Sequence, residues 1–253
     1  MKAMVLAAGL GTRLRALTGD RPKALVEING RTLLEIALAR LRSFGVREVI
    51  INVHHFAGMI VEYLKANNNF GMRIEVSRED VLLDTGGGLK KAAWFFVEDS
   101  SRPDEPFILH NVDVLSTIDL GRMVQFHNEN QALATLAVQE RKASRCLLFD
   151  ERLQLCGRRA EGEEPEIVRS SSTRSARQVQ ELAFCGIHII SPRLFAMMSE
   201  EGAFSIISCY LRLAAQGEKI QAFCADKYYW RDLGTPENIA QAAEDLKQKV
   251  VVF

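Results

Sequence analysis

The sequence has little of what marks membrane, secreted or nucleic-acid-binding proteins. Its 253 residues carry a formal net charge of +0, so no global electrostatic bias favours a nucleic acid or a membrane surface. No run approaches the roughly 20 apolar residues that a membrane helix requires, and the apolar run at residues 4–8 is too short for the core of a signal peptide. We expect a globular cytoplasmic protein that binds neither nucleic acid nor membrane.

Cysteine is also sparse, and its pattern argues against a disulfide framework. The five cysteines are odd in number, and no C-x-x-C pair suggests a zinc knuckle. With 47% hydrophobic residues, the chain can bury a sizeable core. We therefore expect buried, unpaired thiols at Cys146, Cys156, Cys185, Cys209 and Cys224.

Two common nucleotide-binding motifs are missing. Gly9 and Gly11 lack the third glycine of the dinucleotide fingerprint, because Leu14 takes that position. No Gly-x-x-x-x-Gly-Lys-Ser/Thr run occurs anywhere in the chain. A Rossmann dehydrogenase and a P-loop enzyme are both disfavoured.

What the N-terminus does contain is a strand-like run that ends in a glycine turn. Residues 3–7 have the length of a buried strand, and a turn at Gly9 and Gly11 can press its backbone amides against phosphate oxygens. Arg13 adds a planar fork of donors, and Lys23 adds a mobile point charge. This pattern predicts a triphosphate site. The glycines alone would fit an ordinary strand-to-helix turn equally well.

Beyond the turn, strand-like and helix-like segments alternate. This rhythm predicts an α/β protein with a Rossmann-like layered sheet, mostly parallel but mixed, that binds ligands at the carboxyl ends of its strands. We expect strands at residues 3–7, 48–53, 73–77, 107–110, 146–149 and 183–190, and helices at 33–44, 57–65, 89–97, 118–128, 205–215 and 236–249.

Several separated motifs resemble those of the sugar-1-phosphate nucleotidyltransferases. The resemblance covers nearly the whole chain and is to the short bacterial branch that includes N-acetylmuramate-1-phosphate uridylyltransferases, mannose- and heptose-1-phosphate guanylyltransferases and phosphocholine cytidylyltransferases. The matching motifs are Leu6-Ala7-Ala8-Gly9-x-Gly11-Thr12-Arg13-Leu14, Pro22-Lys23-Ala24-Leu25, Gly30 to Glu35, Thr85 to Gly88, Asn111-Val112-Asp113, Gly186-Ile187-His188 and Trp230 to Glu237.

The resemblance implies a fold of the nucleotide-diphospho-sugar transferase type in a single domain, with a nucleotide-binding half at residues 1–140 and a sugar-binding half at 141–253. It implies Mg²⁺-dependent transfer of a nucleoside monophosphate from a nucleoside triphosphate to a sugar 1-phosphate, which yields a nucleotide sugar and pyrophosphate for cell-wall or surface-glycan precursors. The base (U, G or C), the sugar, and the choice between monomer and dimer stay open.

The resemblance also implies roles for individual residues. Asp113 and Asp232 would hold Mg²⁺, whose preferred ligands are oxygens. Arg13 and Lys23 would complete the catalytic set with Asp113 by neutralising phosphate charge. The expected nucleotide-binding residues are Ala7, Ala8, Gly9, Gly11, Thr12, Glu79, Gly86 and Gly87, and the expected sugar-binding residues are Gly186 and Asn111.

Read without the resemblance, some of these residues have plainer interpretations. Asp113 could form a turn, Asp232 could cap the helix that follows it, and Glu79 could be a solvated loop residue. As a base reader, Glu79 would not decide the nucleotide, because a carboxylate accepts hydrogen bonds from guanine and from uracil alike.

One family feature is missing, namely a clear Glu-Lys-Pro in the sugar-binding half. The polar stretch from Gly157 to Gln180 shows neither helix nor strand periodicity, so we expect a loop there that is mobile until ligand binds. Arg158, Arg159 or Arg169 would then meet the sugar phosphate in place of the lysine. The alternative is a surface insertion without function.

Three other functions compete with this interpretation. A catalytically silent homologue that binds nucleotide sugars would not need Arg13, Lys23, Asp113 and Asp232 together. A cytidylyltransferase acting on a non-sugar phosphate such as phosphocholine stays open. A nucleotide-sugar-using glycosyltransferase is disfavoured, because residues 111–113 offer one acid where such enzymes place two.

Overall fold

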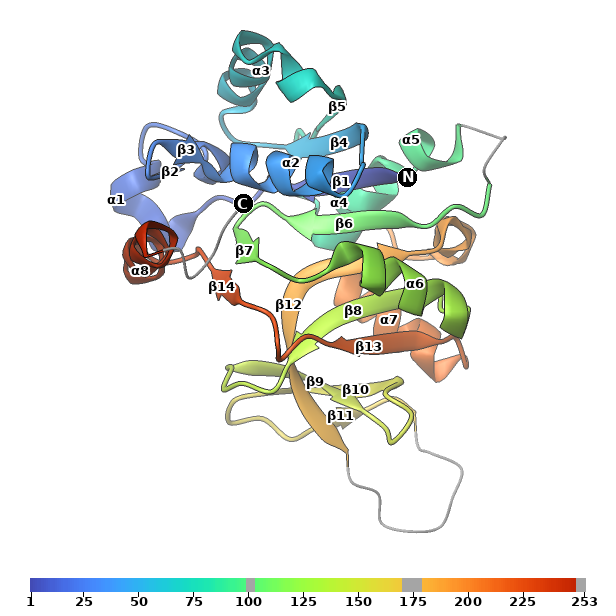
Figure 1. The fold of residues 1–253 in the computed structure, drawn as a ribbon. Coiled ribbons are helices and arrows are strands. Elements are labelled where there is room, and N and C mark those ends of the chain that lie inside the picture. Colours follow the sequence, from blue (N-terminus) through green and yellow to red (C-terminus); the bar gives the residue numbers. More distant parts are fainter. Residues whose placement is uncertain (99–102, 170–178, 249–253) are drawn as a thin grey trace.

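A ten-stranded mixed sheet runs through the molecule (Figure 1). The computed structural model describes residues 1–98, 103–169 and 179–248. The strand order is β11-β10-β9-β12-β6-β1-β4-β5, and β8 pairs with both β12 and β13. The strands are β1 (Lys2–Leu6), β4 (Glu48–Val53), β5 (Arg73–Arg78), β6 (Phe107–Asn111), β8 (Ala134–Gln139), β9 (Arg145–Phe149), β10 (Leu155–Ala160), β11 (Glu166–Ile167), β12 (Gln180–Ile190) and β13 (Ile220–Cys224).

The sheet is parallel where the nucleotide-binding half was expected and antiparallel around β12. Strands β5, β4, β1 and β6 pair in parallel, whereas β12 pairs in antiparallel fashion with β6, β8 and β9. This arrangement confirms the predicted Rossmann-like mixed sheet. A separate two-stranded ribbon of β7 (Val114–Ser116) and β14 (Trp230–Asp232) joins distant parts of the chain, and β2 (Glu27–Ile28) pairs with β3 (Arg31–Thr32).

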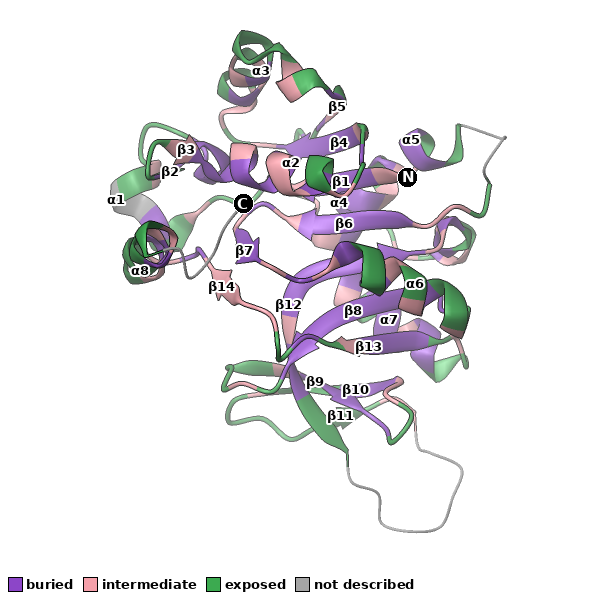
Figure 2. Ribbon diagram, in the orientation of Figure 1, coloured by how far each residue is buried: buried purple, intermediate pink, exposed green. Residues whose placement is uncertain are grey.

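Helices cover both faces of the sheet. Successive strand residues point to opposite sides, so the apolar strands present side chains that need burial on both faces. Ala3 and Val5 belong to one buried cluster and Met4 to the other. The first cluster packs under α2 (Leu33–Ser43), α3 (Ala57–Ala66), α6 (Leu120–Asn130) and α8 (Pro236–Lys247), and the second under α4 (Asp84–Lys91), α5 (Ala93–Val97) and α7 (Ile206–Ala215). Figure 2 shows the buried residues gathered along the strands and the inner faces of these helices.

Short elements complete the chain, and side chains cap the N-termini of α2, α6, α7 and α8. Thr32 Oγ1 accepts a hydrogen bond from Glu35 N at the start of α2, and Thr235 Oγ1 does the same for Asn238 N at the start of α8. The remaining elements are α1 (Arg15–Thr18) and the 3₁₀ helices η1 (Thr12–Leu14), η2 (Lys23–Leu25), η3 (Asn68–Gly71) and η4 (Pro192–Met197).

The structure corrects three expectations. The helix expected at 89–97 is two helices, and the first begins at Asp84, so the three glycines 86–88 are helical. The stretch expected as a loop at 157–180 contains β11 and most of β10, and only residues 170–178 lie outside the described residues. All five cysteines are free as expected, but Cys146 is half-buried and Cys224 is exposed.

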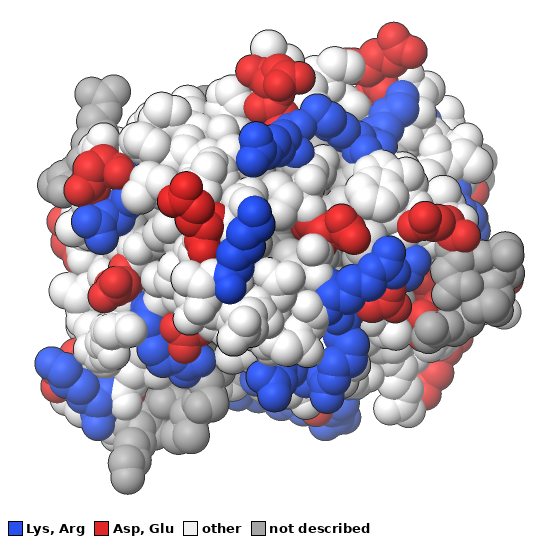
Figure 3. Space-filling model, turned by 90° about the horizontal axis from the view of Figure 1, so that it is seen from above, with Lys and Arg blue, Asp and Glu red and all other residues white. Residues whose placement is uncertain are grey.

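The surface carries both signs of charge. On the face shown in Figure 3, Lys and Arg side chains are interspersed with Asp and Glu, as the formal net charge of +0 allows. Within residues 1–98, 103–169 and 179–248, no helix combines the length and the hydropathy needed to cross a membrane.

Three buried histidines make stability depend on pH. Burial lowers the pKa of His110 and His127 to about 4 and that of His188 to about 3, from an ordinary value of 6.5. The unfolded chain therefore binds protons that the folded chain does not, so stability falls as the pH drops from about 6.5 to about 4. Each histidine adds a slope of up to about 1.4 kcal/mol per pH unit.

We expect urea unfolding between pH 7.5 and 5 to show this loss, and His127→Gln to reduce the slope. The matched control is His55→Gln, because His55 is exposed. An unchanged slope in His127→Gln would contradict the assignment.

Candidate active site

A cavity of about 490 Å³ opens at the carboxyl ends of the parallel strands. In a parallel sheet these ends meet at one edge, which is where α/β proteins bind ligands. Ala7 and Ala8 follow β1, Asn52 lies near the end of β4, Glu79 follows β5, and Asp113 comes shortly after β6. The lining residues are Leu6, Ala7, Ala8, Gly9, Gly11, Thr12, Arg13, Lys23, Asn52, Glu79, Leu82, Asp84, Thr85, Asn111, Val112, Asp113, Ala203 and Gly234.

The glycine turn shapes one end of this cavity. Gly11 has φ +63°, and a β-carbon there would lie 3.2 Å from Lys23 Cβ and 3.1 Å from Thr18 Cγ2. Thr18 Oγ1 donates to Gly11 O at 3.1 Å, and Leu14 N donates to the same oxygen at 2.8 Å. A residue without a side chain at this position thus lets Lys23 approach the turn.

Charged groups converge beside the turn. Lys23 Nζ forms an ion pair with Asp113, and both side chains are largely buried, with 10% and 19% exposed. Leu233 N donates to Asp113 O at 2.8 Å, while Asp232 lies opposite Val114 in the β7–β14 ribbon. The ribbon therefore brings Asp232 opposite the residue that follows Asp113.

Arg13 and Asp232 meet at Gly234. A β-carbon on Gly234 would lie 2.5 Å from Asp232 Oδ1 and 2.7 Å from Arg13 Nη2. Asp232 does not itself line the cavity, and its Oδ1 accepts a hydrogen bond from Gly234 N at 2.9 Å. Asp232 does not cap α8, as its plainer interpretation required, because Thr235 is the N-cap of that helix.

A buried amide organises the other end of the cavity. Asn52 Oδ1 accepts from Ala7 N at 2.8 Å, and Asn52 Nδ2 donates to Glu79 Oε1 at 2.7 Å. Glu79 Oε2 accepts from Leu83 N at 3.0 Å, so each oxygen of this buried carboxylate already has a partner. Sequence reasoning missed Asn52. Its signal was a lone polar residue near the carboxyl end of an apolar strand.

Three glycines that were predicted to bind ligand do not line the cavity. Gly86 and Gly87 lie inside α4 and pack against Phe204 and Gly202, whereas Thr85 lines the cavity instead.

Gly186 does not line the cavity either, but it lies next to Asn111, which does. It has φ +73°, and a β-carbon there would lie 2.8 Å from Asn111 Nδ2 and 2.9 Å from Val114 Cγ2. The position falls where the register between β12 and β8 shifts. Gly186 therefore allows β12 to approach Asn111, which does line the cavity.

The arginines expected to replace the missing lysine have other partners. Arg158 pairs with Glu166 and Arg159 with Glu181, while Arg169 Nη1 donates to Gln154 Oε1 at 2.6 Å. None of them lines the cavity. The lid expected at 157–180 is a strand pair at 155–167, and its remaining part, 170–178, lies outside the described residues.

A different arginine, Arg141, lies beside the β14 ribbon. Its guanidinium carbon lies 3.8 Å from the centre of the Trp230 ring, and Nη2 donates to Phe184 O at 2.8 Å. Its buried Nε has no hydrogen-bond partner within the described residues. Trp230 and Asp232 are two residues apart on one strand and so point to the same side. Arg141 is therefore a cation held beside the face that carries Asp232.

The parallel strand ends, the glycine turn and the converging Arg13, Lys23 and Asp113 define a nucleotide-binding α/β protein. Residues 2–146 match the family model described as Nucleotidyl transferase. The chain belongs to this nucleotidyl transferase family and is a nucleotidyltransferase.

Relatives and solved structures agree with this membership. The chain is 34% identical over 242 residues to N-acetylmuramate alpha-1-phosphate uridylyltransferase of Caulobacter vibrioides, covering 93% of this chain and 92% of that protein. It is 28% identical over 249 residues to mannose-1-phosphate guanylyltransferase of Mycobacterium tuberculosis, covering 96% of this chain and 64% of that protein's length. HddC from Yersinia pseudotuberculosis, complexed with GMP-PN, shares the fold with a TM-score of 0.74 at 22% identity, covering 97% of this chain and 99% of that one.

We expect Asn52→Leu to disturb both stability and nucleotide binding. The change leaves Ala7 N and Glu79 Oε1 without their partner, which costs about 2 to 4 kcal/mol for two buried groups. Urea unfolding measures the loss. The control Asn128→Leu, on an exposed part of α6, should stay within about 0.5 kcal/mol. Equal stability of the two variants would contradict the role of Asn52.

Proposed function

We propose that the protein transfers a nucleoside monophosphate from a nucleoside triphosphate to a sugar 1-phosphate. The observation that carries this proposal is the convergence of Arg13, Lys23 and Asp113 at one end of a cavity whose other end is organised by Asn52 and Glu79. One end suits phosphates and the other suits a base that hydrogen-bonds to backbone groups. The named relatives act on sugar 1-phosphates, which agrees with this division.

The chemistry requires two anions to meet. A phosphate oxygen of the sugar 1-phosphate forms a bond to the α-phosphorus, and the bond from that phosphorus to the bridging oxygen breaks, releasing pyrophosphate. Arg13, on η1 directly after the turn, stabilises negative charge that develops on the α-phosphate and the leaving group. Lys23 binds the phosphates as a point charge.

Two carboxylates of this site fit a magnesium ion. Mg²⁺ commonly uses one or two carboxylates together with substrate phosphates and waters. Asp113 already holds a cation, Lys23 Nζ, and Asp232 lies opposite Val114, the residue that follows Asp113. Bound there, Mg²⁺ would neutralise phosphate charge.

Arg141 is the cation that we assign to the sugar side. Its stacking on Trp230 fixes the plane of the guanidinium, and its partnerless Nε leaves a donor to be satisfied. This assignment replaces Arg158, Arg159 and Arg169, which pair elsewhere.

The relatives support a finer proposal about the nucleotide and the product. We propose uridylyl or guanylyl transfer in the formation of a cell-wall or surface-glycan precursor, in the cytoplasm, where five free thiols stay reduced. A catalytically silent homologue is the second candidate, but it would have no need of both carboxylates beside Arg13.

The test is pyrophosphate release with four nucleoside triphosphates against several sugar 1-phosphates. We expect one combination to dominate and to require Mg²⁺. Asp113→Asn and Asp232→Asn should each lower turnover by at least about 10²-fold, because each removes a charge partner of the metal. The control is Asp104→Asn, an exposed residue. Nucleotide-sugar binding without release in any combination would favour the silent homologue.

Arg141→Gln should raise the KM for the sugar 1-phosphate by about 10- to 100-fold, since a hydrogen bond to a charged group contributes about 1.5 to 3 kcal/mol. The KM for the nucleoside triphosphate should change little. Arg158→Gln is the matched control, because that arginine pairs with Glu166. Steady-state kinetics in which only Arg158→Gln affected the sugar phosphate would reverse the assignment.

A further inference from the structure

One wall of the nucleotide cavity comes from the C-terminal half of the chain. Ala203 lines the cavity together with Leu82, Asp84 and Thr85. It belongs to the segment 199–205, which connects η4 to α7. The cavity is therefore composite, and its shape depends on how this segment is held.

The segment is bound to the start of α4 along its backbone. Phe204 N donates to Leu83 O at 3.1 Å, and Gly86 N donates to Phe204 O at 2.9 Å. Ile206 N donates to Thr85 Oγ1 at 3.0 Å. A β-carbon on Gly86 would lie 2.3 Å from the Phe204 ring, and Gly87 packs against Gly202. The absence of side chains at these two positions therefore allows α4 to pack closely against the segment.

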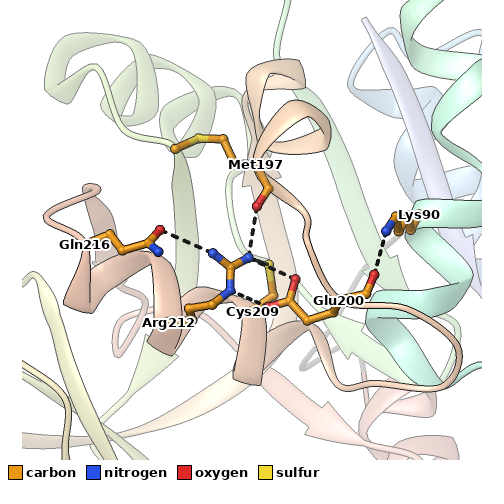
Figure 4. A network of polar contacts seen from close by, with 6 residues as sticks. All are labelled: Lys90, Met197, Glu200, Cys209, Arg212 and Gln216. Carbon is orange, nitrogen blue, oxygen red and sulfur yellow. Dashed lines mark hydrogen bonds and ion pairs between the residues drawn. The ribbon is translucent and has the colours of Figure 1, made fainter.

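Arg212 of α7 holds the other end of the segment (Figure 4). Its Nε donates to Glu200 Oε1 at 2.7 Å, and its Nη2 donates to Glu200 Oε2 at 2.9 Å and to Met197 O at 2.9 Å. These hydrogen bonds lower the pKa of Glu200. Glu200 O in turn accepts from Lys90 Nζ of α4. The fork geometry fixes Glu200 in orientation as well as in position.

We propose that the Arg212–Glu200 ion pair is a positioning device for the nucleotide site, which holds Ala203 in place and thereby sets the affinity for the nucleoside triphosphate. The inference rests on the proposed function. Neither residue lines the cavity, so both act through the segment 199–205. A pre-ordered wall binds more tightly, because ligand binding then does not have to order it.

The phosphate end depends on other elements. Lys23 and Arg13 lie on the N-terminal 3₁₀ helices, and Asp113 lies between β6 and β7. Loss of the ion pair should therefore weaken nucleotide binding without slowing the chemical step. A residue with a merely structural role would not separate the two in this way.

The experiment measures binding of UTP, GTP, CTP and ATP by calorimetry, together with kcat at saturation. We expect Arg212→Gln to weaken binding of the preferred triphosphate about five- to tenfold, in the range of residues that act without touching the ligand. Its kcat should stay within about twofold, and Arg212→Lys should restore part of the affinity. The matched control is Arg193→Gln, because Arg193 pairs with Glu218 at 2.8 Å on the same half of the chain.

The outcomes separate the two proposals. Wild-type protein that binds none of the four nucleoside triphosphates would overturn the proposed function itself, and binding of CTP or ATP alone would overturn its uridylyl or guanylyl form. Wild-type binding with an unchanged affinity in Arg212→Gln, or a fall in kcat alone, would overturn the positioning role only. If Arg212→Gln does not fold, Glu200→Gln gives the same test with a side chain of the same shape. Ala203→Leu should also weaken binding of the nucleoside triphosphate. Unchanged binding in this variant would show that the segment does not face the nucleotide.

Discussion

The geometry of the site depends on one buried amide. Just after β1, the buried backbone amide of Ala7 needs a hydrogen-bond partner. Asn52 supplies it and can hold a second group as well, because a side-chain amide accepts with its oxygen and donates with its nitrogen. It accepts from Ala7 N and donates to Glu79, which in turn accepts from Leu83 N. The glycine turn and the opposite wall are thereby held at a fixed distance.

Short-range patterns in the sequence predicted much of the fold. The strand at 48–53 and the helix at 33–43 follow from apolar periodicity, and the start of α8 follows from Thr235 and Pro236. The ribbon of β7 and β14 escaped prediction, because each strand has three residues and its partner lies far along the chain. The helix expected at 89–97 left out Gly86 and Gly87, and glycine is a poor helix former. Their packing against residues 202–204 decides otherwise.

In the site too, residues on local motifs could be predicted, whereas residues placed by long-range contacts could not. Residues on local motifs, such as Arg13, Lys23 and Asp113, could be placed from the sequence, and the structure brings them together. Arg158 and Arg159 were expected to be available for a phosphate, but Arg158 pairs with Glu166 directly opposite on β11, and Arg159 pairs with Glu181 of β12, beyond β9. Such pairs depend on strand order and register, which the sequence does not reveal. Ala203 reaches the site only through contacts between distant segments.

Charge balance links the proposed role of Lys23 to the proposed roles of Asp113 and Asp232. Lys23 and Asp113 form a largely buried ion pair, and removing one partner of such a pair leaves an uncompensated charge. A phosphate that draws Lys23 away therefore leaves Asp113 in need of a second cation. In our proposal Asp232, which lies opposite Val114 in the β7–β14 ribbon, would share that cation. The phosphate-binding role that we propose for Lys23 and the metal-binding role that we propose for Asp113 and Asp232 are accordingly two parts of one exchange of ion partners, and neither side chain acts independently of the other.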